Sequence, residues 1–192
     1  MSTPAKRLDK TGWLDLGLKT LGKNGPEALG LHRLCETAGK TTGSFYHHFP
    51  DHDAFLSELM AHWAARNTDA LIKQTSDGGA MVDRLVALES AATALSAREE
   101  TGVRKLVSRY PALEKSLAEV DNKRLEYLQK LMAASLPGLT TEEARAFAEI
   151  EYASFVGAQM LWPDNGTSAV KTRQTWSRKL LEAFGTPDQT GS

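Results

Sequence analysis

The feature that most limits the fold is the spacing of apolar residues, which recur every three or four positions and never alternate over a strand-length run. Leu, Ala, Glu and Lys, which favour helices, are abundant, whereas Val and Ile are sparse. Over about residues 6–23, Leu14, Leu18 and Leu21 share one helical face, and the Asn-Gly-Pro sequence at 24–26 ends this helix. The spacing therefore predicts an all-α protein.

The same pattern continues through most of the chain, interrupted by Gly and Pro. Three short helices at the N-terminus predict a helix-turn-helix head, and the longer ones predict a larger helical bundle. We expect the head at residues 1–50, the bundle at 51–185 and a disordered tail at 186–192. About nine helices are predicted, and those after the first cover approximately residues 31–38, 41–48, 52–72, 80–97, 99–108, 111–135, 140–162 and 168–184.

The composition is that of a soluble globular protein, with 41% hydrophobic and 24% charged residues among 192. The longest strongly apolar run, at residues 152–163, is shorter than the roughly 20 residues that a membrane-spanning helix needs. The first ten residues lack the apolar core of a secretory signal. Cys35 is the single cysteine, which excludes an intrachain disulfide and suits a reducing compartment. We expect a cytoplasmic protein with no membrane partner.

Charge is unevenly distributed along the chain. Residues 1–50 contain seven basic and four acidic side chains, which leaves +3, and since the whole chain carries −1 the remainder carries −4. Four of the five histidines lie between residues 32 and 52, three of them within residues 1–50. A positive head on an acidic body favours a polyanionic partner.

The sequence LHRLCETAGKTTGSFYHHF, residues 31–49, has the form of two short helices joined by a glycine-containing turn. Leu34 and Cys35 on the first helix and Phe45 and Phe49 on the second supply an apolar joint. The other side of the second helix carries no acids, and its small, hydroxyl and aromatic side chains suit the major groove of DNA. These outward residues are Thr42, Gly43, Ser44, Tyr46 and His47.

Metal binding and catalysis are the alternatives for this histidine-rich stretch. His48 and His52 have the spacing of a helical ligand pair, but Pro50 lies between them and breaks the helix. Ser44 and His47 lie one helical turn apart, with no third group to orient the base. The sequence also lacks a nucleophile elbow, a phosphate loop and an HExxH motif. We therefore expect no metal site, no cofactor and no enzymatic activity.

The stretch TAGKTTGSFYHHFPDHDAFLSELM, residues 37–60, resembles the DNA-binding motif of the TetR family of transcriptional repressors, and the resemblance covers about residues 8–60. It implies that Tyr46 meets the DNA backbone, that the start of the second helix faces base edges, and that His48 and His52 lie near phosphates. Packing against the first helix is the alternative for His48. The DNA-binding residues implied are His32, Thr41, Thr42, Gly43, Ser44, Tyr46, His47, His48 and His52.

The chain departs from the family pattern at several positions. Lys40 stands where an apolar residue is usual, and Gly30 replaces a capping Ser or Thr. Thr42 and His52 stand where lysine is common. The predicted surface is therefore less cationic than is usual for the family.

The resemblance also implies a homodimer that pairs through its last two helices and presents two reading helices to a palindromic operator in double-stranded DNA. It further implies a small-molecule effector, held by the middle helices, that releases the repressor from DNA. Large aromatic residues of the bundle are the candidate ligand contacts, namely Trp63, Tyr110, Phe155 and Trp162. The alternative function is a helical protein–protein adaptor that uses the same fold without reading DNA, because the head is only weakly cationic.

Overall fold

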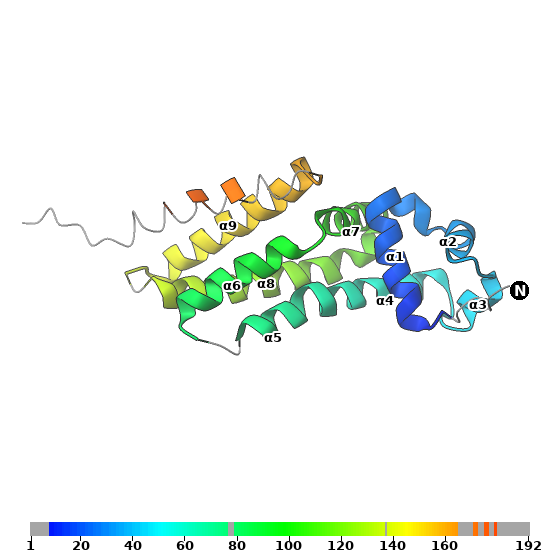
Figure 1. Ribbon diagram of the computed structural model, residues 1–192, viewed down its shortest axis with the longest axis horizontal. Helices are drawn as coiled ribbons and strands as arrows, with labels where there is room; N and C mark the ends of the chain where they lie inside the picture. Colours follow the sequence, from blue (N-terminus) through cyan, green and yellow to red (C-terminus); the bar gives the residue numbers. More distant parts are fainter. Residues whose placement is uncertain are drawn as a thin grey trace, which may run out of the picture. The chain divides into compact units, whose positions relative to one another are not determined.

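The computed structural model describes residues 8–76, 79–136 and 138–164, together with 171–172, 175–176 and 179. Within these ranges every regular element is a helix (Figure 1). The prediction of an all-α protein is confirmed. The chain divides into two compact units, which we call unit 1 (residues 1–65 and 98–117) and unit 2 (residues 66–97 and 118–192).

Unit 1 combines the N-terminal helices with a segment from later in the chain. Its elements are α1 (Lys10–Asn24), η1 (Pro26–Leu29), α2 (Leu31–Ala38), α3 (Thr42–Tyr46), α4 (His52–Ala64), α7 (Ala97–Arg109) and η3 (Pro111–Leu113). α1 begins where Asp9 Oδ1 accepts the Gly12 N–H at 2.7 Å, and it ends at Gly25, whose φ of 78° favours glycine. α2 has no side-chain cap at Gly30, as expected from its sequence.

Aromatic side chains form the core of unit 1. The Phe45 ring is fully buried, and the ring centroids of Trp13, Phe49 and Phe55 lie 5.5, 5.1 and 5.3 Å from it. Aromatic pairs in such arrangements add about 0.5–1.5 kcal/mol each to the effect of apolar burial. Since Trp13 lies on α1, Phe45 on α3 and Phe55 on α4, one cluster holds three helices together. The apolar joint predicted between α2 and α3 is buried as well.

α7 closes unit 1 through two contacts with helices that are distant in the sequence. Gly102 packs against Leu21 of α1, and a Cβ atom at Gly102 would lie 3.1 Å from the Leu21 carbonyl oxygen. The buried Glu100 carboxylate accepts the indole N–H of Trp63, on α4, at 2.9 Å. α7 therefore fixes both α1 and α4.

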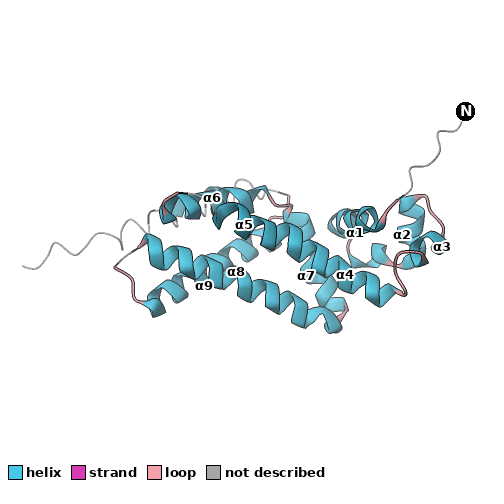
Figure 2. Ribbon diagram, turned by 90° about the horizontal axis from the view of Figure 1, so that it is seen from below, coloured by secondary structure: helices cyan, strands magenta, loops and turns pink. Residues whose placement is uncertain are grey.

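Unit 2 is also built from helices, several of them long (Figure 2). They are a π-helical segment η2 (Ala65–Asp69), α5 (Ala70–Ser76), α6 (Met81–Ala94), most of α8 (Glu114–Ser135) and α9 (Thr141–Leu161). α5 packs against α6. α9 begins with the predicted capping box, in which the Glu143 N–H donates to Thr140 Oγ1 at 3.2 Å and the Thr140 N–H donates to Glu143 Oε2 at 2.8 Å.

One predicted helix differs from the structure. The pattern predicts a continuous helix over about residues 52–72, whereas five π-helical residues separate α4 from α5. In this segment the Thr68 hydroxyl and the Asn67 carbonyl accept hydrogen bonds from Arg124, a contact that apolar periodicity does not report.

The last predicted helix, at 168–184, and the predicted tail, at 186–192, lie outside the described residues, apart from short helical pieces at 171–172, 175–176 and 179. In the part of the chain that the structure describes, no helix is both long and apolar enough to cross a membrane.

Replacing Gly102 with Ala is expected to destabilise the protein, because the added methyl group would meet Leu21 Cγ at 2.9 Å and the Leu21 backbone at 3.1–3.2 Å. We expect the free energy of unfolding, measured by urea denaturation, to fall by about 1–3 kcal/mol, although Ala favours helices over Gly. Lys105→Ala, on the exposed side of the same helix, is the control and should stay within about 0.5 kcal/mol of wild type. Equal stability of G102A and wild type would contradict the close contact.

Candidate DNA-binding surface and ligand cavity

A tight turn positions α3. Gly39 ends α2 with a φ of 60°, a left-handed conformation that favours glycine. Thr41 then caps α3, because its Oγ1 accepts the Ser44 N–H at 3.3 Å. The predicted helix-turn-helix is present in the structure, with its second helix ending at Tyr46 rather than His48.

α3 buries one side and exposes the other. Phe45 is fully buried, whereas Tyr46 is 51% exposed and His47 is also exposed. Gly43 is exposed too, and the nearest atom to a Cβ placed there is Thr41 Oγ1 at 3.8 Å, so another molecule can approach the helix backbone closely. Of the residues implied for DNA, the structure exposes His32, Thr41, Gly43, Tyr46 and His47, and it half-buries Thr42 and Ser44.

The other two implied DNA contacts, His48 and His52, bond to the protein backbone. His48 Nε2 donates to the Leu8 carbonyl at 3.1 Å, and His52 Nε2 donates to the Leu29 carbonyl at 2.9 Å. In a neutral ring with a protonated Nε2, Nδ1 is an acceptor and bonds to a phosphate oxygen only after protonation. Both histidines therefore have a structural role, and their contact with phosphates stays a prediction.

Among the described residues, two basic side chains close to α3 in the sequence are not among the DNA contacts that the resemblance implies. Arg33 is exposed on α2, and Lys40 is half-buried in the turn before α3. Within the described ranges neither of them has an ion-pair partner. Lys10, by contrast, pairs with Glu58 at 2.6 Å. The sequence could have indicated this role for Lys40, because most TetR-family members that it resembles have an apolar residue at that position.

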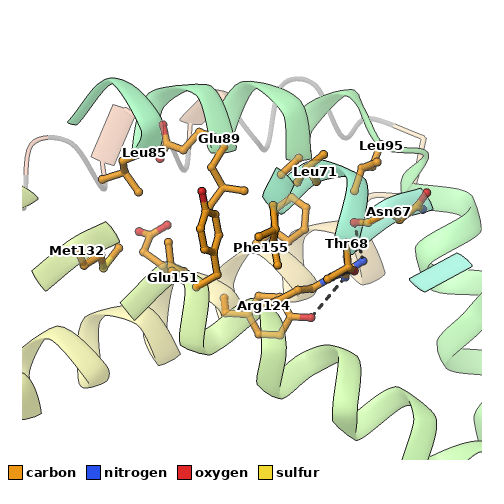
Figure 3. Close-up of a pocket in the computed structure, with 16 residues that line it drawn as sticks. Asn67, Thr68, Leu71, Leu85, Glu89, Leu95, Arg124, Met132, Glu151 and Phe155 are labelled. Carbon is orange, nitrogen blue, oxygen red and sulfur yellow. Dashed lines mark hydrogen bonds between the residues drawn. The ribbon is translucent and has the colours of Figure 1, made fainter. Parts of the chain in front are cut away.

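The four aromatic residues expected to contact a ligand have different surroundings. Trp63 is buried in unit 1, where it donates to Glu100, and the Tyr110 ring lies 6.3 Å from the His52 ring in the same unit. Trp162, after the end of α9, is 49% exposed. Phe155 is the one of the four that lines a cavity described in unit 2 (Figure 3).

This cavity has a volume of about 90 Å³, is partly open to solvent, and is bounded by residues of η2, α5, α6, α8 and α9 and by Leu95. On α8 the lining residues Arg124, Tyr127, Leu128 and Met132 recur at helical spacing, so one face of this helix meets the cavity. Arg124, a charged residue within an apolar stripe, is the feature of the sequence that could have indicated this cavity-lining face. The remaining walls are Asn67, Thr68, Leu71, Ile72, Leu85, Leu88, Glu89, Ala92, Leu95, Glu151, Tyr152 and Phe155.

Arg124 joins three elements at the edge of the cavity (Figure 3). Its Nε–H donates to the Thr68 hydroxyl at 2.8 Å, and Nη2 donates to the Asn67 carbonyl at 3.2 Å. Nη1 lies 3.5 Å from the Tyr152 hydroxyl, which in turn donates to the Asp121 carboxylate at 2.6 Å. The guanidinium group therefore fastens the π-helical segment and α9 to α8.

The pKa values of the two tyrosines that line the cavity are shifted in opposite directions. Burial raises the pKa of Tyr152 to about 12. Burial also acts to raise the pKa of Tyr127, but hydrogen bonds with Ser76 and Thr75 and the nearby positive charge of Arg84 outweigh it and lower that pKa. The Tyr127 hydroxyl lies 2.9 Å from Thr75 Oγ1 and accepts from Ser76 Oγ at 3.4 Å.

The outward-facing helix-turn-helix of unit 1, together with the cavity of unit 2, is the arrangement typical of helix-turn-helix DNA-binding proteins that respond to a ligand. Residues 14–59 match the family model described as bacterial regulatory proteins, tetR family. Residues 14–59, which include the helix-turn-helix, therefore match the DNA-binding part of the TetR family. A comparison with curated proteins gives no match.

Three solved structures illustrate the shared fold. Reduced NemR of Escherichia coli superposes with a TM-score of 0.75 at 19% identity, over 88% of this chain and 95% of that one. FadR of Bacillus subtilis in complex with stearoyl-CoA gives 0.68 at 16%, over 92% and 99%. A transcriptional regulator from Saccharomonospora viridis in complex with choline gives 0.73 at 15%, over 90% and 95%. At these identities the similarity establishes the fold.

The raised pKa of Tyr152 predicts a loss of stability at alkaline pH. The unfolded tyrosine ionises near pH 10, whereas the folded one keeps its proton up to about pH 12. The stabilisation is therefore complete below pH 10 and is lost as pH rises through 12, by roughly 2–3 kcal/mol.

Chemical denaturation between pH 9 and pH 12, followed by circular dichroism, is the measurement. Tyr152→Phe removes the ionisable group and should flatten the fall in unfolding free energy. Tyr127→Phe should steepen it, because the pKa of Tyr127 is shifted downward. Identical slopes for wild type and Y152F would show that Tyr152 is not held protonated by the fold.

Proposed function

We propose that this chain is a ligand-responsive DNA-binding transcriptional regulator, a cytoplasmic repressor that a small-molecule effector releases from its operator. The observation that carries the proposal is the exposure of α3 within the segment that matches the family model. In this proposal residues 1–50 read DNA, and residues 51–185 bind the effector and form the dimer. The regulator itself performs no chemistry.

The surface around α3 supplies the groups that reading DNA requires. Thr42, Gly43, Ser44 and His47 face base edges in the proposed complex, and the open space at Gly43 supports close approach to the groove. Tyr46 donates its hydroxyl to the DNA backbone, and Arg33, His32 and Lys40 add phosphate contacts. Thr41 positions the helix through its cap. His48 and His52 reach phosphates through Nδ1 when protonated.

Effector binding is assigned to the cavity of unit 2, through Phe155 and its neighbours. The structurally similar FadR and Saccharomonospora regulators were solved with stearoyl-CoA and choline, two ligands of different chemistry. An effector that binds the DNA-released conformation more tightly lowers operator affinity, and operator DNA lowers effector affinity by the same factor.

α9 carries the surface proposed for the homodimer. Ile150 and Leu161 are 64% and 68% exposed, and they share one side of the helix with Gly157, where a Cβ would meet no atom within 4 Å. An exposed apolar stripe with a small residue at its centre suits pairing of two copies. A two-fold dimer presents two copies of α3 to a palindromic operator.

Tyr46→Ala is expected to weaken operator binding by about tenfold or more, because a hydrogen bond to a charged phosphate contributes roughly 1.5–3 kcal/mol. Tyr46→Phe keeps the ring and isolates the hydroxyl. The measurement is a gel shift with DNA from upstream of the protein's own gene, repeated over a salt titration. Affinity should fall steeply with salt. Unchanged affinity in Y46A, or binding indifferent to salt, would favour the protein–protein adaptor instead.

The double substitution Ile150→Lys and Leu161→Lys is expected to separate the dimer. Burying an unpaired charge costs several kcal/mol, so the dimer dissociation constant should rise at least about 100-fold. Sedimentation equilibrium at micromolar concentration gives the mass directly. Val86→Lys, at a 60% exposed apolar position on α6, is the control and should leave the mass unchanged. A dimer that persists in the double variant would place the interface elsewhere.

A further inference from the structure

We infer that the effector is a compact, uncharged, apolar molecule, about the size of a single aromatic ring. The inference rests on the proposed function, in which the cavity of unit 2 is the effector site. It concerns the chemical class of the ligand, on which the similar structures differ, since one holds stearoyl-CoA and another holds choline.

The volume of the cavity limits the size of the ligand group that it can enclose. At about 90 Å³ it is smaller than the roughly 150 Å³ apolar cavity that binds benzene in an engineered protein, and it is several times the space that one water needs. A long acyl-CoA such as the one bound to FadR is much larger than this space, so most of it would lie outside the cavity. The largest group that this space can enclose is therefore about one ring or a short branched chain.

The walls of the cavity are carbon for most of their extent. Leu71, Leu85, Leu95 and Phe155 point toward the same space from α5, α6, the end of α6 and α9 (Figure 3). Apolar ligand surface gains free energy when it leaves water for such a wall, whereas a hydrated group finds few hydrogen-bond partners there. The hydrocarbon part of a ligand therefore gains the most binding free energy from entering the cavity.

The polar groups that line the cavity are bonded to one another. Arg124 donates to Thr68 and Asn67, and the Tyr152 hydroxyl donates to Asp121 outside the cavity lining. An anionic ligand that recruited Arg124 would have to break its bonds to the π-helical segment. Leaving buried polar groups without partners costs about 1–3 kcal/mol each. The arginine is thus a structural group and not an open anion site.

Two carboxylates, Glu89 and Glu151, also line the cavity, which raises the case of a cationic ligand. Neither carboxylate is free of partners within the protein. Both are only half-buried, and two half-buried arginines, Arg84 and Arg124, belong to the same polar shell. Asp121, which accepts from Tyr152, adds a third carboxylate to this shell, and each of these five charged residues has a partner within the protein. An added net charge would be desolvated without a dedicated counter-charge.

Three probes with the same ring test this inference on the full-length protein. Toluene is neutral, benzoate is an anion, and benzylammonium, the form of benzylamine at pH 7, is a cation. Isothermal titration calorimetry is expected to show saturable binding of toluene, with benzoate and benzylammonium at least tenfold weaker. Tighter binding of either charged probe, or no binding of toluene, would overturn the inference.

A matched pair of variants on α6 locates the binding. Ala92→Leu adds a side chain to the cavity wall and should weaken toluene binding at least tenfold. Ala94→Leu makes the same change at an exposed position of the same helix and should bind toluene as wild type does. Equal toluene affinity in A92L and wild type would place the probe outside this cavity and overturn the assignment.

The gel shift separates this inference from the proposed function. Operator binding together with preference for a charged probe refutes the neutral ligand class and leaves the regulator intact. Toluene binding in the cavity without any operator binding refutes the regulator and supports the described chemistry of the cavity. Under both proposals, saturating toluene lowers operator affinity in wild type and A94L, and has at least tenfold less potency in A92L.

Discussion

The burial of Phe45 is the interaction on which the surface of unit 1 depends. α3 has only five residues, and a helix of that length is unstable in isolation, because nucleation costs more than one turn of hydrogen bonds returns. The Phe45 ring, enclosed by Trp13, Phe49 and Phe55, contributes the tertiary stabilisation that the helix lacks. Tyr46 lies about 100° around the helix from the inward-pointing Phe45, and its side chain is 51% exposed. One buried ring thus sets which side of α3 meets a partner.

Unit 2 relies on polar bonds where unit 1 relies on aromatic packing. The π-helical segment disturbs the regular hydrogen bonding of a long helix, and Arg124 meets the Thr68 hydroxyl and the Asn67 carbonyl that this segment presents. The same guanidinium lies beside Tyr152 of α9. An apolar cavity can persist next to this network because the network satisfies itself and does not need water inside.

Local signals were enough to predict much of the fold from the sequence. The range of α2, the Thr41 cap, and the capping box of Thr140 and Glu143 follow from residues a few positions apart. Long-range bonds were not accessible in this way. The acceptors for His48 and His52 are carbonyl groups 40 and 23 positions away, and nothing in the local pattern identifies them.

The candidate ligand residues show the same limit. A large aromatic residue at helical spacing looks alike whether it fills a core, as Trp63 does, or borders a cavity, as Phe155 does. Only the meeting of α6, α8 and α9 distinguishes the two, and that meeting depends on tertiary structure. The arginine in the apolar stripe of α8 was the better clue, because a buried charge requires partners.

The weak positive charge of the head and the small size of the cavity suit each other, because a weakly bound operator can be released by a small coupling free energy. Among the described residues few cations lie near α3, which implies modest phosphate affinity, since each neutralised phosphate contributes through counterion release. A ligand of one ring gains at most about 1.5 kcal/mol per non-hydrogen atom, and only the difference between its affinities for two conformations acts on DNA. Coupling free energies of about 1–3 kcal/mol are typical of allosteric proteins. A regulator held on DNA by many lysines would need a larger coupling free energy for release than so small an effector can supply. A regulator that binds DNA through Arg33, Lys40 and neutral donors needs less.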